Sequence, residues 1–251
     1  MKFRFKAFGL HATCSAVALS LIVGILYFLW YRWPGWYLAG ALHAVAVMVA
    51  VDVVIGPLIT LLIASPRKPR RELTRDIAII VLIQLTALGY GAETLWQGRP
   101  LYYAYSVNCL SVVQAFDIDA DSLKVARDQK SELVPHWYSL PRWIYAPLPQ
   151  DPDESDKIVQ SAVQGGADVI DMPQYYEPWS NGQKDLQTQL KKLDDIQFFS
   201  VKQKALLKQR MQSLGLATDR SDSIALTGRA QSVLAVLDPV SLKIRAIIKP
   251  T

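Results

Sequence analysis

The stretch Val51-Asp-Val-Val-Ile-Gly-Pro-Leu-Ile-Thr-Leu-Leu62 places a single carboxylate in the middle of a long apolar run. An ionised aspartate at the centre of a membrane helix costs about 3 kcal/mol on insertion scales. Asp52 is therefore expected to be neutral, or to face protein or water. Pro57 has no N–H and leaves the carbonyl of Val53 without its helical donor, so the sequence predicts a kinked or loosened helix at Gly56-Pro57.

Three apolar runs around this stretch are long enough to cross a bilayer, which takes about 20 helical residues. They cover residues 7–31, about 37–64 and about 77–96. The first run follows a basic start, as a signal peptide does, but it is too long and lacks a small-residue cleavage pattern. We therefore predict a retained anchor and two further membrane spans.

Basic residues predict the orientation of these spans. The first 98 residues hold nine Lys and Arg against four Asp and Glu, which accounts for the whole formal charge of +5. Only Arg32 lies between the first and second runs, and the others flank the opposite ends: Lys2, Arg4, Lys6, Arg67, Lys68, Arg70, Arg71 and Arg75. By the positive-inside rule, the N-terminus faces the cytoplasm and the C-terminal part lies in the periplasm.

Aromatic residues at the other ends of the runs agree with this orientation. They form an expected belt at the outer interface: Trp30, Tyr31, Trp33, Trp36, Tyr37 and Trp96. The basic excess lies beside apolar runs instead of on a folded face, so we expect no nucleic-acid binding.

The predicted fold class is α+β, with a membrane domain over residues 1–98 and a periplasmic domain over 99–251. The second domain shows strand-rich, helical and proline-rich segments. We predict one or two strands in 101–116, a helix capped by Asp119 or Asp121, an extended or loop segment over 135–149, a helix over 153–163, a helical stretch over 184–214 that breaks near Gln197, and a hairpin of 232–237 with 242–248.

Motifs for catalysis or metal binding are absent from the sequence. There is no nucleophile elbow, phosphate loop or paired-histidine zinc motif. His136 is the only histidine in the C-terminal domain, and the acidic run 151–156 fails the spacing of a calcium loop and suits a helix start. Cys14 and Cys109 fall in different domains, so we predict no disulfide within one chain. We expect no enzyme activity, no cofactor and no metal.

Asp52 has a candidate partner in Gln84 of the third run, about one helical turn nearer the cytoplasm. Three interpretations are open. The two residues lock the helices together, they line a polar groove for a partner's helix, or they belong to a proton or ion path. Two pairs of small residues at helical spacing, Gly40 with Ala44 and Ala87 with Gly91, permit close helix contact.

Several motifs together resemble the TfpX/TfpZ family of type IV pilin accessory proteins. They are Lys6-Ala-Phe8, the stretch 51–62, Leu73-Thr-Arg-Asp76, Gln84-Leu-Thr-Ala-Leu-Gly-Tyr-Gly91 and Arg99-Pro100, and the match covers residues 1–118. The positions that match the family's pattern are Asp52, Gly56, Pro57, Asp76, Gln84, Arg99 and Pro100, which we take as partner-binding or helix-packing candidates.

The resemblance implies a non-enzymatic, chaperone-like helper in the bacterial inner membrane that acts on pilin stability, pilus assembly or pilus dynamics. Its implied partners are inner-membrane lipid and the type IV major pilin, bound through the pilin's transmembrane helix and periplasmic head. The family supplies no catalytic residue. The alternatives are a membrane-anchored sensor or transporter subunit and, less favoured, an exported hydrolase that depends on His136.

Overall fold

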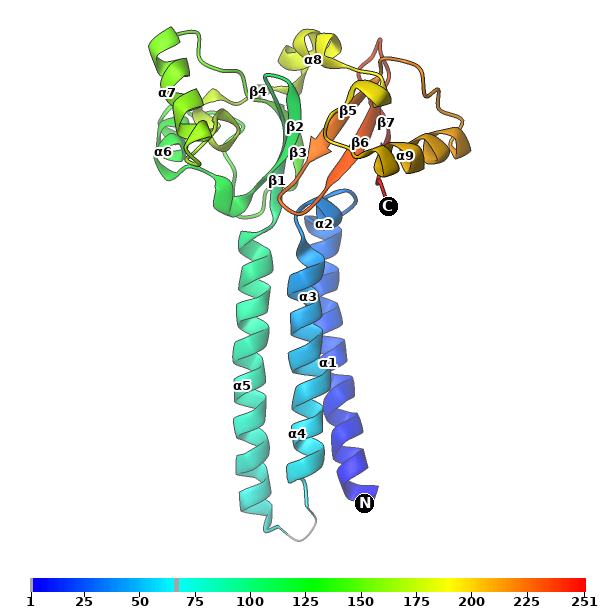
Figure 1. Ribbon diagram of the computed structural model, residues 1–251. Coiled ribbons are helices and arrows are strands. Elements are labelled where there is room, and N and C mark those ends of the chain that lie inside the picture. The colour runs from blue at the N-terminus through cyan, green and yellow to red at the C-terminus, as the bar shows by residue number, and fades with distance from the viewer. Residues whose placement is uncertain (1, 66–67) are drawn as a thin grey trace. The chain divides into compact units, whose positions relative to one another are not determined.

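The computed structural model describes residues 2–65 and 68–251 and divides into two compact units (Figure 1). The helical unit contains the residues up to Arg32 and Gly40–Gly98, and the α+β unit contains Trp33–Ala39 and Arg99–Thr251. Arg67, one of the basic residues that predict the orientation of the spans, lies outside the described residues. Three long apolar helices and a mixed sheet with helices confirm the predicted α+β class.

Three helical runs make up the helical unit, and each is long and apolar enough to cross a membrane. They are α1 (Lys2–Leu29), a second run over Ala41–Ile63, and α5 (Arg70–Gln97). The helices begin at Ala41 and Arg70 instead of about residues 37 and 77. Hydropathy marks only the apolar part of a span. Backbone hydrogen bonding extends α5 toward its N-terminus into charged residues, whereas the second run begins only after Gly40, which has a positive φ of 73°.

The second run is not a uniform α-helix. It consists of α3 (Ala41–Val49), the π-helix η1 (Ala50–Ile55) and α4 (Gly56–Ile63). The wider π turn thus surrounds Asp52 and ends at the Gly56-Pro57 pair, where the sequence predicts a loosened helix.

One mixed sheet forms the centre of the α+β unit, with the strand order β4-β3-β1-β2-β5-β6-β7. Its strands are β1 (Pro100–Ser106), β2 (Cys109–Gln114), β3 (Arg142–Tyr145), β4 (Glu177–Pro178), β5 (Ser223–Thr227), β6 (Ser232–Leu237) and β7 (Ile244–Ile248). The β1–β3 and β2–β5 pairs are parallel and the others are antiparallel. The predicted strands in 101–116 and the 232–248 hairpin are confirmed. Strands β4 and β5 were not predicted, and β3 is a sheet strand inside the segment 135–149 that was predicted to be extended or a loop.

Helices of the α+β unit connect these strands. They are α2 (Gly35–Leu38), α6 (Ala120–Asp128), α7 (Pro152–Val163), α8 (Gln183–Gln189) and α9 (Val201–Ser213), with short 3-10 turns at 115–117, 169–171, 173–175, 179–182 and 193–195. Asp119 caps α6 through the N–H of Ser122, and Asp151 caps α7 through the N–H of Glu154, as the acidic run suggested. The predicted break near Gln197 is longer than expected and extends from Leu190 to Ser200.

The segment Trp33–Ala39 lies between two membrane-length helices in sequence but belongs to the α+β unit. Leu38 is fully buried in the core beside the sheet residues Leu226 and Ala235. The Leu38 carbonyl accepts the N–H of Ala230, and the indole N–H of Trp33 donates to the carbonyl of Ile247 at 3.3 Å. Tertiary contacts therefore place this loop in the sheet domain, which its sequence position did not predict.

Candidate functional site

The π-helix around Asp52 follows from the residues that end it. The N–H of Gly56 donates to the carbonyl of Val51, five residues earlier, which is the spacing of a π turn. The next residue, Pro57, has no N–H to donate, so a regular α-helical ladder cannot continue through it. Single π turns inside α-helices occur often at functional sites because they re-aim side chains.

Gln84 on α5 connects this turn to the third helix. Its side-chain amide donates to the main-chain carbonyl of Asp52 at 3.0 Å, and both residues are buried. Gly56 makes the approach possible, since a Cβ at this position would overlap the Gln84 side chain. The structure thus brings together four predicted positions, namely Asp52, Gly56, Pro57 and Gln84, and places the Asp52–Gln84 contact where the sequence suggested one.

The Asp52 carboxyl group does not take part in this helix contact. The residue is only 2% exposed, yet neither carboxyl oxygen has a hydrogen-bond partner among the described residues. The same holds for the side-chain oxygen of Gln84. The helices are therefore joined by the Gln84 amide and a backbone carbonyl, which leaves three buried acceptor oxygens unused.

A second polar pair lies in the same bundle. Nδ1 of His11 on α1 is 2.6 Å from the hydroxyl of Thr60 on α4, and that hydroxyl also donates to the Gly56 carbonyl at 3.2 Å. Neither His11 nor Thr60 is among the site residues predicted from the sequence. Both could have been predicted, since each is a hydrogen-bonding side chain inside an apolar run.

A pocket of about 180 Å³ lies beside the unused acceptors. Asp52 and Gln84 supply its polar lining together with His11. The other lining residues come from α1 and α5 and are small on α1 and aliphatic on α5: Cys14, Ser15, Ala18, Val81, Leu85 and Leu88. The arrangement is a partly open, mainly apolar site whose lining includes two residues with buried, unused acceptors, which suits ligands that bring hydrogen-bond donors.

Asp76 does not line this pocket. Its carboxylate accepts a hydrogen bond from the Lys68 ammonium at 2.7 Å, and Arg75 lies 3.8 Å away. Lys68 also contacts Glu72 at 3.4 Å. The bond to Asp76 raises the pKa of Lys68. This charge cluster connects the first turns of α5 to the preceding loop, so Asp76 has a local structural contact.

Arg99 and Pro100 belong to the α+β unit and not to the Asp52 cluster. Pro100 begins β1, and its register partner on β2 is Gln114. Arg99 is buried, and its carbonyl accepts the N–H of Ala115. Both residues therefore shape the first strand pair of the sheet.

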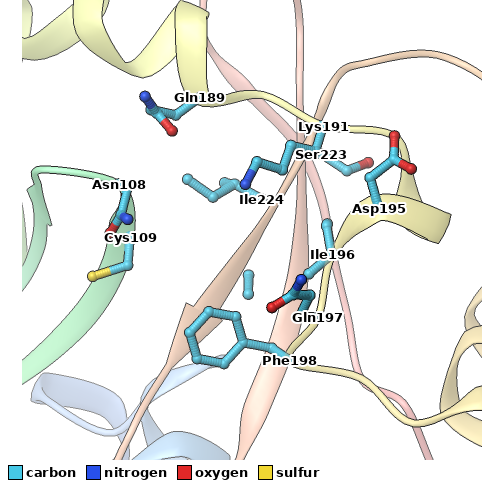
Figure 2. A pocket seen from close by; sticks show the side chains of 11 residues that line it. Asn108, Cys109, Gln189, Lys191, Asp195, Ile196, Gln197, Phe198, Ser223 and Ile224 are labelled. Atoms are coloured by element: carbon cyan, nitrogen blue, oxygen red, sulfur yellow. The ribbon is translucent and has the colours of Figure 1, made fainter.

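The α+β unit has a pocket of its own, about 280 Å³ in volume, beside the first residues of β2 and β5, before the two positions at which these strands pair. Figure 2 shows Asn108 and Cys109 on one side of it, Lys191 and Ser223 across from them, and the Phe198 ring below. Burial raises the pKa of the Cys109 thiol, so the protonated, weakly nucleophilic form is favoured.

A carboxylate cluster near the start of α6 has a strongly perturbed member. Burial is the largest cause that raises the pKa of Asp171, to about 6, and the charges of Asp117 and Asp168 act in the same direction. The N–H of Asp168 and the guanidinium of Arg229 oppose the shift. Arg229 is held by Asp117 at 2.6 Å and lies over the Phe116 ring.

Within the described residues, no three His, Cys, Asp or Glu side chains are placed to hold a metal ion. His136 is exposed and its ring stacks on that of Tyr138, with 5.3 Å between the centroids. Cys14 and Cys109 are free thiols.

Comparison with known proteins links the chain to fimbrial assembly proteins of Dichelobacter nodosus. Those of serogroup I and serogroup E1 are each 24% identical to it over 241 residues, which is 94% of this chain and 91% of either relative. The fimbrial assembly protein of serogroups C1 and C2 is 29% identical over 124 residues, which is 49% of this chain and 95% of that relative. No family model and no solved structure matches the chain. The two longer alignments span the helical unit and the α+β unit alike.

Proposed function

We propose that this chain is a membrane-embedded accessory protein of fimbrial assembly, of the type IV pilin accessory kind that its N-terminal motifs resemble. The observation that carries the proposal is the similarity to proteins named for fimbrial assembly over 94% of the chain. Three helices long and apolar enough to span a membrane support its location. A similarity confined to one unit would have supported the proposal for that unit only.

The proposed role is to bind pilin and not to catalyse a reaction. The best-defined polar site is a set of unused acceptors in the helical unit, and such a site offers hydrogen bonds to a partner. The exposed His136 and the protonated Cys109 thiol give no nucleophile–base pair of the kind hydrolases need.

In the proposed topology, the chain lies in the inner membrane with its N-terminus in the cytoplasm and the α+β unit in the periplasm. The basic residues in the first turns of α1 and around the start of α5 support this orientation by the positive-inside rule. A periplasm-specific reporter fused after Thr251 should be active, and a cytoplasm-specific reporter at the same position should be silent. The reverse result would place the α+β unit on the wrong side to meet exported pilin.

The proposed partner is the type IV major pilin, with its apolar helix held by the helical unit and its head met by the α+β unit. A protein that contacts both parts would stabilise pilin in the membrane before the subunit enters the fibre. This arrangement accounts for an accessory protein that combines three spans with a folded domain.

Removal of the chain from its host tests the role directly. We expect fewer surface fimbriae, with pilin lost from the sheared surface fraction, and recovery when the full chain is restored. Affinity-tagged wild-type chain should co-purify with pilin from detergent-solubilised membranes. Normal fimbriation without the chain, together with no recovered pilin, would overturn the proposed function.

A further inference from the structure

The helical unit holds more hydrogen-bond acceptors than it uses. The Gln84 amide joins α5 to the π turn through the backbone carbonyl of Asp52, so this helix contact needs no carboxyl group. Both carboxyl oxygens of Asp52 and the side-chain oxygen of Gln84 remain without partners in the described structure. A carboxyl that served only to lock helices would be expected to form the contact, and this one does not.

The position of Asp52 limits what can reach it. Asp52 is the central residue of the run Ala41–Ile63, so it lies near the middle of a membrane span. The ester and phosphate groups of lipids stay near the interfaces, so we take the donor that reaches this depth to come from another protein segment. A membrane-crossing segment satisfies its own backbone only as a helix or closed barrel.

The walls of the pocket fit such a helix. Small side chains on α1, namely Cys14, Ser15 and Ala18, leave room for close backbone approach. Across from them, the aliphatic Leu85 of α5 lines the pocket while 60% of its surface remains exposed. The buried, unpartnered Asp52 supplies a specific polar contact that a stripe of small residues alone would lack.

We infer that the pocket beside Asp52 binds the apolar helix of the pilin partner through a hydroxyl, amide or ammonium donor on that helix, which pairs with Asp52 and Gln84. This inference rests on the proposed function. Whether Asp52 is ionised or protonated, Asp52 and Gln84 together keep surplus acceptors, because protonation supplies one donor against their three unused oxygens. The expected partner residue is therefore a donor within an otherwise apolar helix.

Photo-crosslinking in intact cells tests the contact. A photoreactive amino acid replaces Leu85, which lines the pocket, or Ile83, which is 63% exposed and does not line it. The Leu85 probe should capture pilin through its apolar helix within about one turn, or 5.4 Å, of a donor side chain, and the Ile83 probe should not. Mass spectrometry of the crosslinked peptide identifies the partner and the residue.

Variants at the acceptor then test the chemistry. Asp52→Leu should lower the Leu85 crosslink yield about fivefold, as expected for one lost hydrogen bond between membrane helices. Asp52→Asn keeps one acceptor oxygen and should lower it less than about twofold. Thr94→Val removes a hydroxyl of the same unit that bonds to the Tyr90 carbonyl of its own helix and does not line the pocket, and the yield should stay unchanged. The amount of each variant in the membrane controls for folding. If Asp52→Leu fails to insert, the crosslink yield of Asp52→Asn tests the acceptor role instead.

The outcomes separate this inference from the proposed function. Pilin capture at Leu85 that persists in Asp52→Leu would overturn the acceptor role while pilin binding stands. No capture at Leu85, but capture from the exposed Trp137 of the α+β unit, would overturn the membrane site and leave the function intact. Capture of a second copy of this chain at Leu85 would also overturn the inference. Failure of the wild-type chain to recover any pilin would overturn both.

Discussion

The two units of this protein place polar and apolar side chains in opposite ways. In the helical unit, Asp52, Thr60 and Gln84 are buried while leucines such as Leu21, Leu62 and Leu82 are 62–74% exposed. In the α+β unit, the buried core consists of residues such as Leu226 and Val233. One physical rule explains both, since apolar side chains avoid water but not lipid. Hydrogen bonds and close contact therefore hold the helical unit, and apolar burial holds the α+β unit.

The largest loss of stability is expected at Leu38, which lies between two membrane-length helices in the sequence but packs in the α+β core. Leu38→Ala removes a fully buried side chain from the α+β core and should lower its unfolding free energy by about 2–5 kcal/mol. Leu42→Ala, four residues later on the exposed surface of α3, is the matched control. Urea titration in detergent, followed by near-ultraviolet circular dichroism, measures the difference. Equal midpoints for both variants would contradict the assignment of Trp33–Ala39 to the α+β unit.

A somewhat smaller effect is expected from overpacking in the helical unit. The methyl group of Gly56→Ala would collide with the Gln84 side chain and should destabilise the unit by about 1–3 kcal/mol. Gly24→Ala on α1 meets no atom within 4 Å and serves as control. Unfolding of the detergent-purified protein by sodium dodecyl sulfate reports the change. If Gly56→Ala matches Gly24→Ala, the close approach of α5 to the π turn is wrong.

Loss of the interhelical hydrogen bond should be milder. Gln84→Leu removes the donor to the Asp52 carbonyl, and such bonds between membrane helices contribute about 0.6–1.7 kcal/mol. Thr86→Val removes a hydroxyl that bonds only to its own helix, at the Leu82 carbonyl. The same detergent assay compares them. A larger loss in Thr86→Val than in Gln84→Leu would show that Gln84 does not join the helices.

The last effect concerns pH and the α+β unit. The folded-state pKa of Asp171, about 6, lies above its ordinary value of 3.8, so the folded protein binds more protons between these values. This contribution to stability is fully present below about pH 3.8 and is lost as the pH rises through about 6.

Asp171→Asn should therefore flatten the dependence of the urea midpoint on pH between about 4 and 6. The asparagine oxygen can still accept the N–H of Asp168, so the turn is kept. The exposed Asp128→Asn controls for the change in net charge. A dependence of the urea midpoint on pH that is the same in Asp171→Asn as in the wild type would contradict the assignment.

Local patterns predicted the parts of the fold that depend on neighbouring residues. Asp119 acts as a helix cap, the acidic run 151–156 begins α7, and the hairpin of β6 and β7 forms where expected. Strand β5 was missed because its run Ser-Ile-Ala-Leu-Thr has only three apolar residues, and its pairing with β2 joins residues more than a hundred positions apart.

Part of the candidate site was also predicted from local sequence features. Asp52, Pro57 and Gln84 stood out because polar or helix-breaking residues inside apolar runs are costly. That Gln84 binds the Asp52 backbone, and leaves the carboxyl unused, depends on how two helices meet and has no sequence signal. His11 and Thr60 were overlooked, although both are polar residues within spans.

The amino-acid sequence by itself determined three apolar helices, an acid at the centre of the second, and an α+β domain after them, because hydropathy and turn chemistry act over a few residues. Only the tertiary structure decided that Trp33–Ala39 joins the sheet domain, that β2 and β5 run parallel, and that a pocket with unused acceptors lies beside Asp52. These features arise from contacts between distant segments, whose energies depend on the whole chain being folded.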